Sequence, residues 1–384
     1  MAKKNTLEYQ TLKIKSSNII YISDIHFGVN SSSEEWQENI KDYFYEFFIP
    51  LVKNELRNNP DTVICCLGDV YHDRKSIDID VNNLSIDIFE DLSVLLPVYI
   101  INGNHDLSKK TNKGNSSLRS VTNINNCFVI KEPTLLKFYE GTKCISNIAA
   151  IPYLGDCNNE NKCLVEFNGK ADYALMHTDI SKMKFDNGMT IVGAVDAEKF
   201  NGRIISGHIH KRQEANNVIY VGSPYQLSRG DVGNMKGIYV HNLKDGSFRF
   251  IENTYSPVFQ KIDITQFLNF TEKERFDVLR NNYNDIIIDE TNLDKYKMSD
   301  IYEVINLCDS KRTQIVVIKS KTKNKDGEDI DPDEIIEYSL EQLIEQAIDN
   351  IDSDEETKTI LKALSADYLK NAQIALDAQS ATNL

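Results

Sequence analysis

The apolar residues in the first half of this chain gather in short runs that are rich in β-branched side chains. Five of these runs carry the pattern most clearly, at residues 18–23, 62–67, 97–101, 172–176 and 203–206. Apolar runs of about four to eight residues that end at glycine or polar residues are typical of strands buried on both faces. The pattern therefore predicts a sheet-based domain with polar loops at the strand ends.

Helical spacing lies between these runs. Apolar and aromatic residues recur at roughly helical spacing over residues 34–59, namely at Trp36, Ile40, Tyr43, Phe44, Phe47, Leu51 and Leu56. Pro50 lacks a backbone N–H, so we expect it to kink this long helix or split it in two. A second helix is predicted at residues 81–95, and short strands with Gly and Asn turns at residues 127–151 and 218–251. Two packed mixed sheets with helices outside are the expected architecture.

The chain beyond residue 258 has a different pattern. Strand, helix, strand, helix and strand alternate over residues 261–264, 272–281, 285–289, 300–307 and 314–320, which predicts a small α+β domain over residues 259–320. A charged link at residues 321–334 has no apolar periodicity. Residues 335–384 predict two amphipathic helices, the second beginning at a capping box of Ser353 and Glu356. These helices either pack back on the small domain or dock on a partner helix or coiled coil.

Each of the five apolar runs is followed by polar residues that can bind metal ions. In chain order these are Asp24-Ile25-His26, Gly68-Asp69-Val70-Tyr71-His72, Gly103-Asn104-His105-Asp106, a lone His177, and Gly207-His208-Ile209-His210. Six of the seven histidines fall within this series. A mixture of carboxylate, amide and imidazole ligands suits Mn, Fe or Zn. Two such ions about 3.5–4 Å apart stabilise an in-line displacement at phosphorus, so the series predicts a two-metal phosphoesterase.

The order of these motifs resembles that of the calcineurin-like metallophosphoesterase superfamily, and within it the double-strand-break repair nucleases of the SbcD type. His72 follows Gly68-Asp69 as in those nucleases, and the segment 220–231, YVGSPYQLSRGD, is similar to phage recombination endonuclease subunits. The resemblance covers residues 17–258 well and the last third only in layout. It implies an α+β fold with a four-layer β-sandwich flanked by helices, a small α+β capping domain and C-terminal helices.

The resemblance also implies a role for each motif residue. Asp24, His26, Asp69 and His210 would hold one metal ion, and Asp69 would bridge to a second ion held by Asn104, His177 and His208. A water shared by the ions would attack phosphorus. His105 would donate a proton to the leaving 3′ oxygen, with Asp106 orienting its ring. His72 would touch the phosphate or support catalysis from behind the ligands; a purely structural hydrogen bond is the alternative. His241, outside the series, is expected to be structural.

The net charge of the chain bears on whether DNA is its substrate. The net charge is −15, and residues 259–384 hold 15 Lys/Arg against 27 Asp/Glu, which leaves 28 against 31 in residues 1–258. Proteins that bind polyanions are normally basic, so strong DNA binding by this chain alone is not expected. Cations nevertheless follow the motifs, at Arg74, Lys75, Lys109, Lys110, Lys113, Arg119, Lys211 and Arg212. Solvated surface positions are the alternative explanation for each.

The resemblance makes the expected function that of a Mn²⁺-dependent DNA nuclease subunit, with 3′→5′ exonuclease and single-strand or structure-specific endonuclease activity. The expected partners are DNA, an SbcC-like coiled-coil ATPase that binds the terminal helices, and a second copy of the chain through residues 34–59, although core burial explains those aromatics equally well. Alternatives are a phosphoesterase for small molecules or phosphoproteins, and a scaffold subunit with a vestigial site. Asp73-Arg74 also resembles the GDxxDR pattern of serine/threonine phosphatases, which we interpret as coincidence.

Cysteine usage and hydropathy bear on the compartment. The seven cysteines form no CxxC pair, which favours a reduced, cytoplasmic environment, and Cys157 with Cys163 lacks two further ligands for a zinc site. No run of about 18 apolar residues predicts a membrane span, and the first residues show no signal-peptide pattern.

Overall fold

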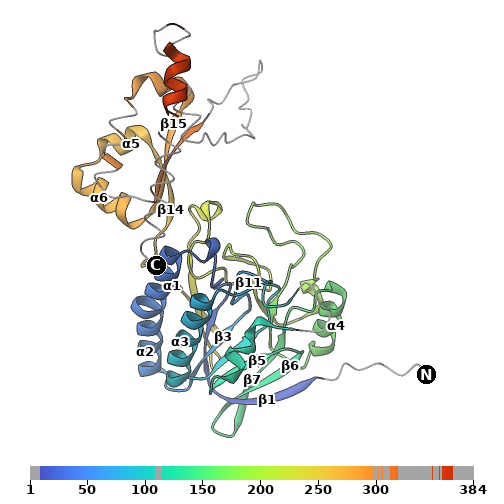
Figure 1. The fold of residues 1–384 in the computed structure, drawn as a ribbon. Helices are drawn as coiled ribbons and strands as arrows, with labels where there is room; N and C mark the ends of the chain where they lie inside the picture. The colour runs from blue at the N-terminus through green and yellow to red at the C-terminus, as the bar shows by residue number, and fades with distance from the viewer. Residues whose placement is uncertain are drawn as a thin grey trace. The chain divides into compact units, whose positions relative to one another are not determined.

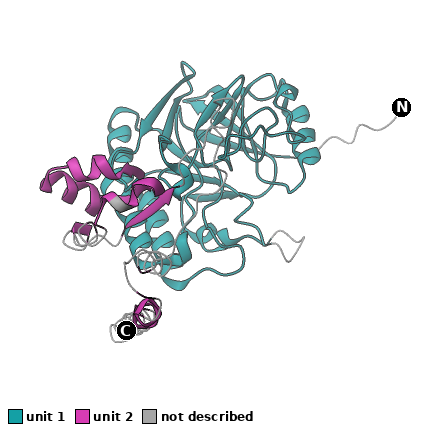
Figure 2. Cartoon of the chain, turned by 90° about the horizontal axis from the view of Figure 1, so that it is seen from above, with its two compact units in different colours: residues 1–259 teal, residues 260–384 magenta. Residues whose placement is uncertain are grey.

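The computed structural model describes residues 9–108, 115–297, 301, 304–305, 312–318, 348, 354 and 357–365. The chain forms two compact units, Met1–Phe259 and Gln260–Leu384, shown in separate colours in Figure 2. All five motifs belong to the first unit.

Two mixed sheets form the centre of the first unit (Figure 1). The larger has seven strands in the order β1-β6-β7-β8-β9-β11-β10. These strands are β1 (Gln10–Lys15), β6 (Thr134–Glu140), β7 (Lys143–Ile151), β8 (Tyr173–His177), β9 (Arg203–Gly207), β10 (Gln213–Ala215) and β11 (Val218–Tyr220). The smaller has six strands in the order β13-β12-β2-β3-β4-β5. These are β2 (Asn18–Ile22), β3 (Thr62–Cys66), β4 (Val98–Ile101), β5 (Cys127–Ile130), β12 (Gly237–Asn242) and β13 (Ser247–Glu252).

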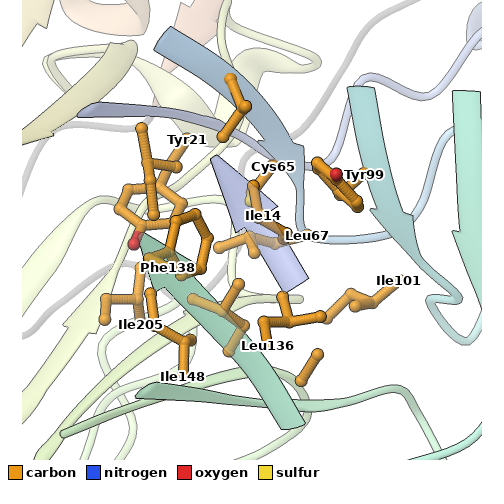
Figure 3. Packing of buried hydrophobic residues seen from close by; sticks show 14 of the residues in the cluster. Ile14, Tyr21, Cys65, Leu67, Tyr99, Ile101, Leu136, Phe138, Ile148 and Ile205 are labelled. Atoms are coloured by element: carbon orange, nitrogen blue, oxygen red, sulfur yellow. The ribbon is translucent and has the colours of Figure 1, made fainter. Parts of the chain in front are cut away.

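An apolar core fills the space between the two sheets (Figure 3). Strand β2 contributes Ile19 and Tyr21 to it, and β6 contributes Leu136 and Phe138. Successive side chains of a strand point to opposite faces, so the residues between them face the flanking helices. All five residues of β2 are buried, as expected for a strand covered on both faces. The expected mixed fold of packed sheets and helices is confirmed.

Helices cover the outer faces of the sheets (Figure 1). They are α1 (Glu34–Asp42), α2 (Ile49–Asn58) and α3 (Ile79–Leu95) beside the smaller sheet, and α4 (Cys157–Phe167) beside the larger one. Leu164 and Phe167 of α4 are fully buried against Met176 of β8 and its neighbours. Short 3-10 segments are η3 (Ser117–Arg119), η4 (Val121–Asn123), η5 (Ala197–Lys199), η6 (Arg229–Asp231) and η7 (Glu290–Lys295). In the part of the chain described above, none of the helices has both the length and the apolar character needed to cross a bilayer.

Pro50 does not break the helix predicted at residues 34–59. A π-helical segment, η2 (Tyr43–Phe48), joins α1 to α2, and Asp42, Phe48 and Ile49 keep helical backbone angles. Pro50 follows the π-helical segment, and the wider turn there accommodates the backbone N–H that proline lacks. The expected kink or split is thus replaced by a local widening of one continuous helix.

The motif loops all leave the carboxyl ends of parallel strands. Strands β2, β3 and β4 are parallel neighbours in the smaller sheet, and β8 and β9 are parallel neighbours in the larger sheet. Parallel neighbours present their carboxyl ends at one edge, where α/β sheets place their sites. The fold therefore brings the first three motifs together, and the last two together.

The second unit is built on a three-stranded sheet in the order β14-β15-β16. Its elements are β14 (Phe259–Asp263), α5 (Ile264–Asn269), α6 (Glu272–Asn281), β15 (Tyr283–Asp289) and β16 (Thr313–Ile318). Helix α5 was not expected. Residues 301, 304 and 305 are helical, as predicted for residues 300–307, whose other members lie outside the described residues.

The predicted tail lies largely outside the described part of the chain. The charged link at residues 321–334, the first terminal helix, and Ser353 with Glu356 all fall there, apart from the single helical residue Ile348. Residues 357–365 are helical, and the Asp354 carboxylate accepts the N–H of Thr357 at 2.7 Å near the start of this helix. The division of residues 259–384 into three parts stays a prediction.

Candidate metal centre

The backbone of the motif loops is strained at the residues that carry the ligands. Asp24, His26 and Asp69 have φ values of 54°, 53° and 51°, and His208 has a φ of 90°. Left-handed conformations at non-glycine residues cost roughly 1–3 kcal/mol each and cluster at functional sites. Two backbone hydrogen bonds lock the first two loops together, from Asp24 N–H to the Gly68 carbonyl and from His26 N–H to that of Asp69, each at 3.1 Å.

Two glycines allow the loops to approach one another closely. A Cβ at Gly103 would lie 2.2 Å from Oδ1 of Asp69, and a Cβ at Gly207 would lie 2.0 Å from Oγ of Ser23. Real Cβ atoms never approach other atoms so closely, so a larger residue would push the third and fifth motifs away from the first two. This explains why glycine precedes the ligands in these motifs.

Asp24, His26 and His210 form one group of potential ligands. Their ligand atoms lie within 4.8 Å of one another. Nε2 of His26 is 3.1 Å from Nε2 of His210. Asp24 is fully buried, and its carboxylate accepts the N–H of His208 at 3.0 Å, which ties the first motif to the fifth.

Asp69, His177 and His208 form a second group within the same distance, and Asn104 joins it. Oδ1 of Asn104 lies 2.8 Å from Nε2 of His177 and 2.9 Å from Nδ1 of His208. His177, the ligand supported by the weakest sequence signal, is completely buried within this group.

Asp69 lies between the two groups. Its Oδ1 is 3.2 Å from Nε2 of His177, and its Oδ2 is 3.7 Å from Nε2 of His26. Burial alone would raise the pKa of Asp69, but the imidazoles of His177, His26 and His105 outweigh burial and hold the pKa well below its usual range. An ionised carboxylate with one oxygen toward each group is the arrangement that a bridging ligand requires.

The donor atoms of the second group fit a shared cation. The Leu67 carbonyl can only accept, so Nδ1 of His177, 2.6 Å away, carries the ring proton. Nε2 of the neutral ring is then a lone pair that faces oxygen atoms of Asp69 and Asn104. Burial lowers the pKa of His177, but the Asp69 carboxylate outweighs burial and raises the pKa to about 9, so without a metal ion the ring holds a second proton on Nε2, the place that a cation would take. Mixed nitrogen and oxygen donors suit Mn, Fe or Zn.

His72 and His105 lie beside the first group. The rings of His26 and His105 are 5.0 Å apart, and those of His72 and His105 are 5.7 Å apart and stacked. Nδ1 of His105 donates to the carbonyl oxygen of His72 at 2.6 Å, which leaves Nε2 for other chemistry. Nδ1 of His72 is 3.3 Å from Nδ1 of His26. Both expected catalytic histidines are therefore next to the ligands.

Asp106 does not act as expected. Its Oδ1 accepts the N–H groups of Val70 and Tyr71, and its Oδ2 accepts that of Gly103 at 2.9 Å. Burial is the main cause that raises its pKa, to about 7. The carboxyl group thus joins the second and third motif loops, while the His72 carbonyl, and not Asp106, orients the ring of His105.

Arg74 is nearer the site than its motif suggested. Its guanidinium lies against the Asn104 amide, and with that amide turned over Nη2 would donate to the Asn104 oxygen. The oxygen-inward orientation is the one that a metal ligand requires. Arg74, one of the cations that follow the motifs in the sequence, therefore lies beside a proposed ligand. Lys109, Lys110 and Lys113 lie outside the described residues.

A cleft of about 740 Å³ opens beside His72. Its walls are two loops, 28–32 and 72–79, and its lining is Gly28, Ser31, Ser32, His72, Asp73, Ser76, Ile77, Asp78 and Ile79. The segment η1 (Asn30–Ser32) in the first wall has three consecutive left-handed residues. The two aspartates disfavour a phosphate inside this cleft, whereas its size and serines suit a neutral nucleobase or sugar.

Comparison with known proteins agrees with this geometry. The calcineurin-like phosphoesterase family matches residues 17–212, slightly more than half of the chain. Exonuclease subunit 1 of Enterobacteria phage T4 is 27% identical over 359 residues, which cover 88% of this chain and 95% of the phage protein. Uncharacterized protein R555 of Acanthamoeba polyphaga mimivirus is 26% identical over 314 residues, 77% of this chain and 23% of that protein.

Two solved structures are similar at low identity. Nuclease MPE from Pseudomonas putida is 12% identical with a TM-score of 0.27, and 61% of this chain aligns with 87% of it. The calcineurin-like phosphoesterase YfkN from Bacillus subtilis is 16% identical with a TM-score of 0.32, and the alignment covers 61% and 88% of the two chains. The family assignment rests on the sequence match, which spans every motif from Asp24 to His210. The chain belongs to the calcineurin-like phosphoesterase family.

Proposed function

We propose that this chain is a metal-dependent nuclease that hydrolyses DNA phosphodiester bonds. The observation that carries the proposal is the position of Asp69 between two groups of ligand side chains, with the rings of His72 and His105 beside them. Such a centre suits in-line displacement at phosphorus. The phage T4 relative is named an exonuclease subunit, and the alignment covers nearly all of it, which favours DNA over other phosphoesters.

The chain's own groups have distinct roles in this chemistry. Divalent ions held by Asp24, His26, Asp69, Asn104, His177, His208 and His210 would polarise the scissile phosphate and lower the pKa of water. His105, held through Nδ1, would carry a proton on Nε2 to the leaving 3′ oxygen. Arg74 would pair with a non-bridging phosphate oxygen, because a guanidinium presents two parallel N–H donors. His72 would touch the phosphate from the cleft side.

Manganese is the ion we propose. Four imidazoles among seven ligands are too many for Mg²⁺ or Ca²⁺, which prefer oxygen. Two carboxylates and an amide oxygen make the set harder than a typical zinc site of cysteine and histidine. Mn²⁺ accepts both kinds of donor at a flexible coordination number.

The DNA-processing assembly is a further part of the proposal. We propose 3′→5′ exonuclease and single-strand or structure-specific endonuclease activity, within an SbcCD-like repair or recombination complex in the cytoplasm. The acidic chain, at −15, would bind DNA only weakly by itself, and an SbcC-like coiled-coil ATPase would strengthen that binding. Ile360 and Leu364, 54% and 61% exposed and one helical turn apart, support docking of the terminal helices on that partner.

A homodimer stays part of the proposal, but four of the aromatic residues of α1 and η2 do not support it. Trp36, Tyr43, Phe44 and Phe48 are all at least 92% buried within the chain itself. Tyr43 packs edge-on against Tyr225, and Phe44 stacks on Phe27. These four residues belong to the core of the first unit, whereas Tyr45 and Phe47 of η2 are partly exposed, so a dimer through this helix would rest on those two aromatics.

A substrate panel tests the proposal. The purified chain would be incubated in Mn²⁺ with end-labelled duplex and single-stranded DNA, a 3′-phosphorylated nucleotide, a phosphopeptide and bis(p-nitrophenyl) phosphate. We expect stepwise shortening of DNA from the 3′ end and slow turnover of bis(p-nitrophenyl) phosphate. Efficient release of phosphate from the nucleotide or peptide, with intact DNA, would assign the site to small-molecule or protein phosphoesters instead.

A further inference from the structure

His208 presents its two ring nitrogens to different parts of the site. Nδ1 lies 2.9 Å from Oδ1 of Asn104, on the side of the second ligand group. Nε2 lies 3.2 Å from Oδ1 of Asp179. Asp179 follows His177 by two residues at the end of β8, and no motif in the sequence singled it out.

Oδ1 of the Asp179 carboxylate is a buried acceptor that lacks a hydrogen-bond donor. This oxygen is shielded from solvent and has no hydrogen-bond partner among the described residues, although Nε2 of His208 lies 3.2 Å away. A buried carboxylate oxygen without a donor is costly, because it has lost its water and gained nothing in return. The Nε2–H of His208 is the donor atom that faces it.

From these contacts we infer that Asp179 is a positioning residue that fixes His208 as a metal ligand through Nδ1. An acceptor opposite Nε2 favours the tautomer with the proton on Nε2, and this tautomer leaves the Nδ1 lone pair toward Asp69 and Asn104. Carboxylates that hold the second nitrogen of a ligating imidazole raise its basicity and fix its orientation. The inference rests on the proposed metal centre and adds the group behind one ligand.

The ring of His177 is also held by an acceptor, but at Nδ1, whereas the ring of His208 meets its acceptor at Nε2. Its Nδ1 donates to the Leu67 carbonyl at 2.6 Å, so its Nε2 faces Asp69. Each imidazole of the second group thus has one nitrogen on an acceptor and the other toward shared ligand atoms. A carbonyl performs this role for His177, and a carboxylate performs it for His208.

His208 needs such support because its backbone is strained. Its φ of 90° is unfavourable for a residue with a side chain. Asp24 holds the backbone by accepting the His208 N–H at 3.0 Å, and Asp179 holds the ring. Two carboxylates thereby fix both ends of the residue.

The segment that carries Asp179 is itself fixed from behind. Tyr220 of β11 donates its hydroxyl to the Thr178 carbonyl at 2.8 Å, and the Thr178 hydroxyl donates to Glu160 of α4 at 2.6 Å. The other oxygen of Glu160 accepts the N–H of Leu154 at 3.0 Å. Glu160 and Thr178 are 1% and 4% exposed, so this brace is dry and rigid.

Metal binding without DNA tests the inference. Mn²⁺ binding to the full chain would be followed by titration with electron paramagnetic resonance detection of free Mn²⁺, for wild type, Asp179→Ala and Asp179→Asn. We expect Asp179→Ala to weaken one of two sites by roughly 10–100-fold, the usual cost of losing such a partner. Asp179→Asn should weaken it less, because the amide oxygen still accepts. Asp186→Asn is the matched control: this aspartate accepts the Lys211 N–H, and the asparagine oxygen can still accept it.

Tautomer state gives the second readout. In Zn²⁺-loaded protein, nitrogen NMR of labelled histidine should show His208 protonated at Nε2 in wild type and in Asp186→Asn. Equal Mn²⁺ affinities in wild type and Asp179→Ala, or a wild-type His208 protonated at Nδ1, would overturn the inference. If Asp179→Ala fails to fold, Asp179→Asn and the wild-type spectrum decide. Because neither readout involves DNA, a wild type that binds two ions without cutting DNA would sink only the proposed function.

Discussion

At the scale of single residues, His105 differs from the other imidazoles of the centre in what holds it. Its Nδ1 donates to a backbone carbonyl, and its backbone N–H donates to Asp69 at 2.7 Å, so the residue is anchored without being part of either ligand group. It does lie within reach of His26 and His72. Since Nδ1 is held by the carbonyl, Nε2 is the nitrogen that suits proton transfer.

His105→Ser should therefore spare the metal ions and slow DNA cleavage. General acid catalysis contributes roughly 10²–10⁴-fold, so we expect the rate constant for DNA cleavage to fall by that amount. Bis(p-nitrophenyl) phosphate should be affected much less, because p-nitrophenolate leaves without a proton. Rates on both substrates and Mn²⁺ affinity are measured together. A variant that cuts DNA at the wild-type rate would remove His105 from the mechanism.

A buried ion pair supports His210 from behind. Nζ of Lys236 donates to Oδ1 of Asp231 at 2.5 Å and to the carbonyl oxygen of His210 at 2.7 Å. The two side chains are only 4% and 5% exposed. Neither residue belongs to a ligand motif, yet the pair fixes the backbone of a ligand.

Lys236→Met should destabilise the first unit by about 3–5 kcal/mol, because it leaves the Asp231 carboxylate buried without its counter-ion. The double variant Asp231→Asn/Lys236→Met should recover much of that loss, since no charge remains. Urea unfolding of the three proteins measures both values. A single variant as stable as wild type would show that the pair contributes nothing.

The pair of Asp231 and Lys236 should also make the stability of the fold depend on pH. Burial alone would raise the pKa of Asp231, but the Lys236 ammonium outweighs burial and lowers the pKa. A carboxyl whose pKa is lower in the folded state stabilises the fold at neutral pH, and this stability is lost as pH falls through the folded pKa. Stability should therefore fall less below pH 4 in the double variant than in wild type. Urea unfolding at several pH values measures this difference. If stability falls equally with pH in both proteins, Asp231 is not the group responsible.

At the scale of elements, the strands were predictable and helix α4 was not. Runs of β-branched residues identify β2, β3 and β4 because these strands are buried on both faces and tolerate little else. Helix α4 has the sequence CNNENKCLVEF, whose asparagines have poor helix propensity. Its stability comes from the Asp156 cap, which accepts the N–H of Asn158, and from burial of Leu164 and Phe167. Both are tertiary or local effects that periodicity does not reveal.

The site was predictable where residue type and order suffice. The residues expected to bind metal could be named from residue type, motif order and the family resemblance, and the structure brings them together in two groups of potential ligands. The role of Asp106 was misjudged and Asp179 was missed, because their partners lie far from them in the sequence. Asp106 contacts Val70 across 36 residues, and Asp179 contacts His208 across a strand connection. Such pairings depend on how loops from two sheets meet.

The cleft between the loops 28–32 and 72–79 leads to a prediction about substrate size. Ser76→Trp should fill the cleft and lower cleavage of DNA by roughly tenfold or more, a loss of about 1.4 kcal/mol of transition-state stabilisation. Turnover of bis(p-nitrophenyl) phosphate, which carries no nucleobase, should stay unchanged. Val94→Trp at an exposed position of α3 is the matched control. Equal losses on both substrates would show that the cleft does not hold a nucleotide.

At the scale of the whole molecule, metal binding should be visible in stability. Ions that bind only the folded state raise the free energy of unfolding by about 2.7 kcal/mol when their free concentration is 100 times Kd. For a domain of this size, each kcal/mol of added unfolding free energy raises Tm by roughly 2–4 °C. Tm in Mn²⁺ should therefore be about 5–10 °C higher than Tm in EDTA. Asp69→Asn, which removes the shared carboxylate, should lose most of this rise. An equal rise in the variant would place the ions elsewhere.

The distribution of charge along the chain bears on how DNA would be bound. The first 258 residues are nearly neutral, and the remaining residues carry most of the negative charge. We therefore expect the centre to supply the phosphodiester chemistry and a partner to supply the basic surface for strong DNA binding. This is the physical reason to expect a partner that holds the DNA.

The most direct measurement of the central claim is DNA cleavage by the purified chain in Mn²⁺, Mg²⁺ or EDTA, beside Asp69→Asn. The variant keeps an oxygen to accept the His105 N–H, so its fold should survive. We predict Mn²⁺-dependent degradation of end-labelled DNA that disappears in EDTA and in Asp69→Asn. Degradation that persists in EDTA, or that Asp69→Asn performs at the wild-type rate, would contradict a DNA-cutting centre built around Asp69.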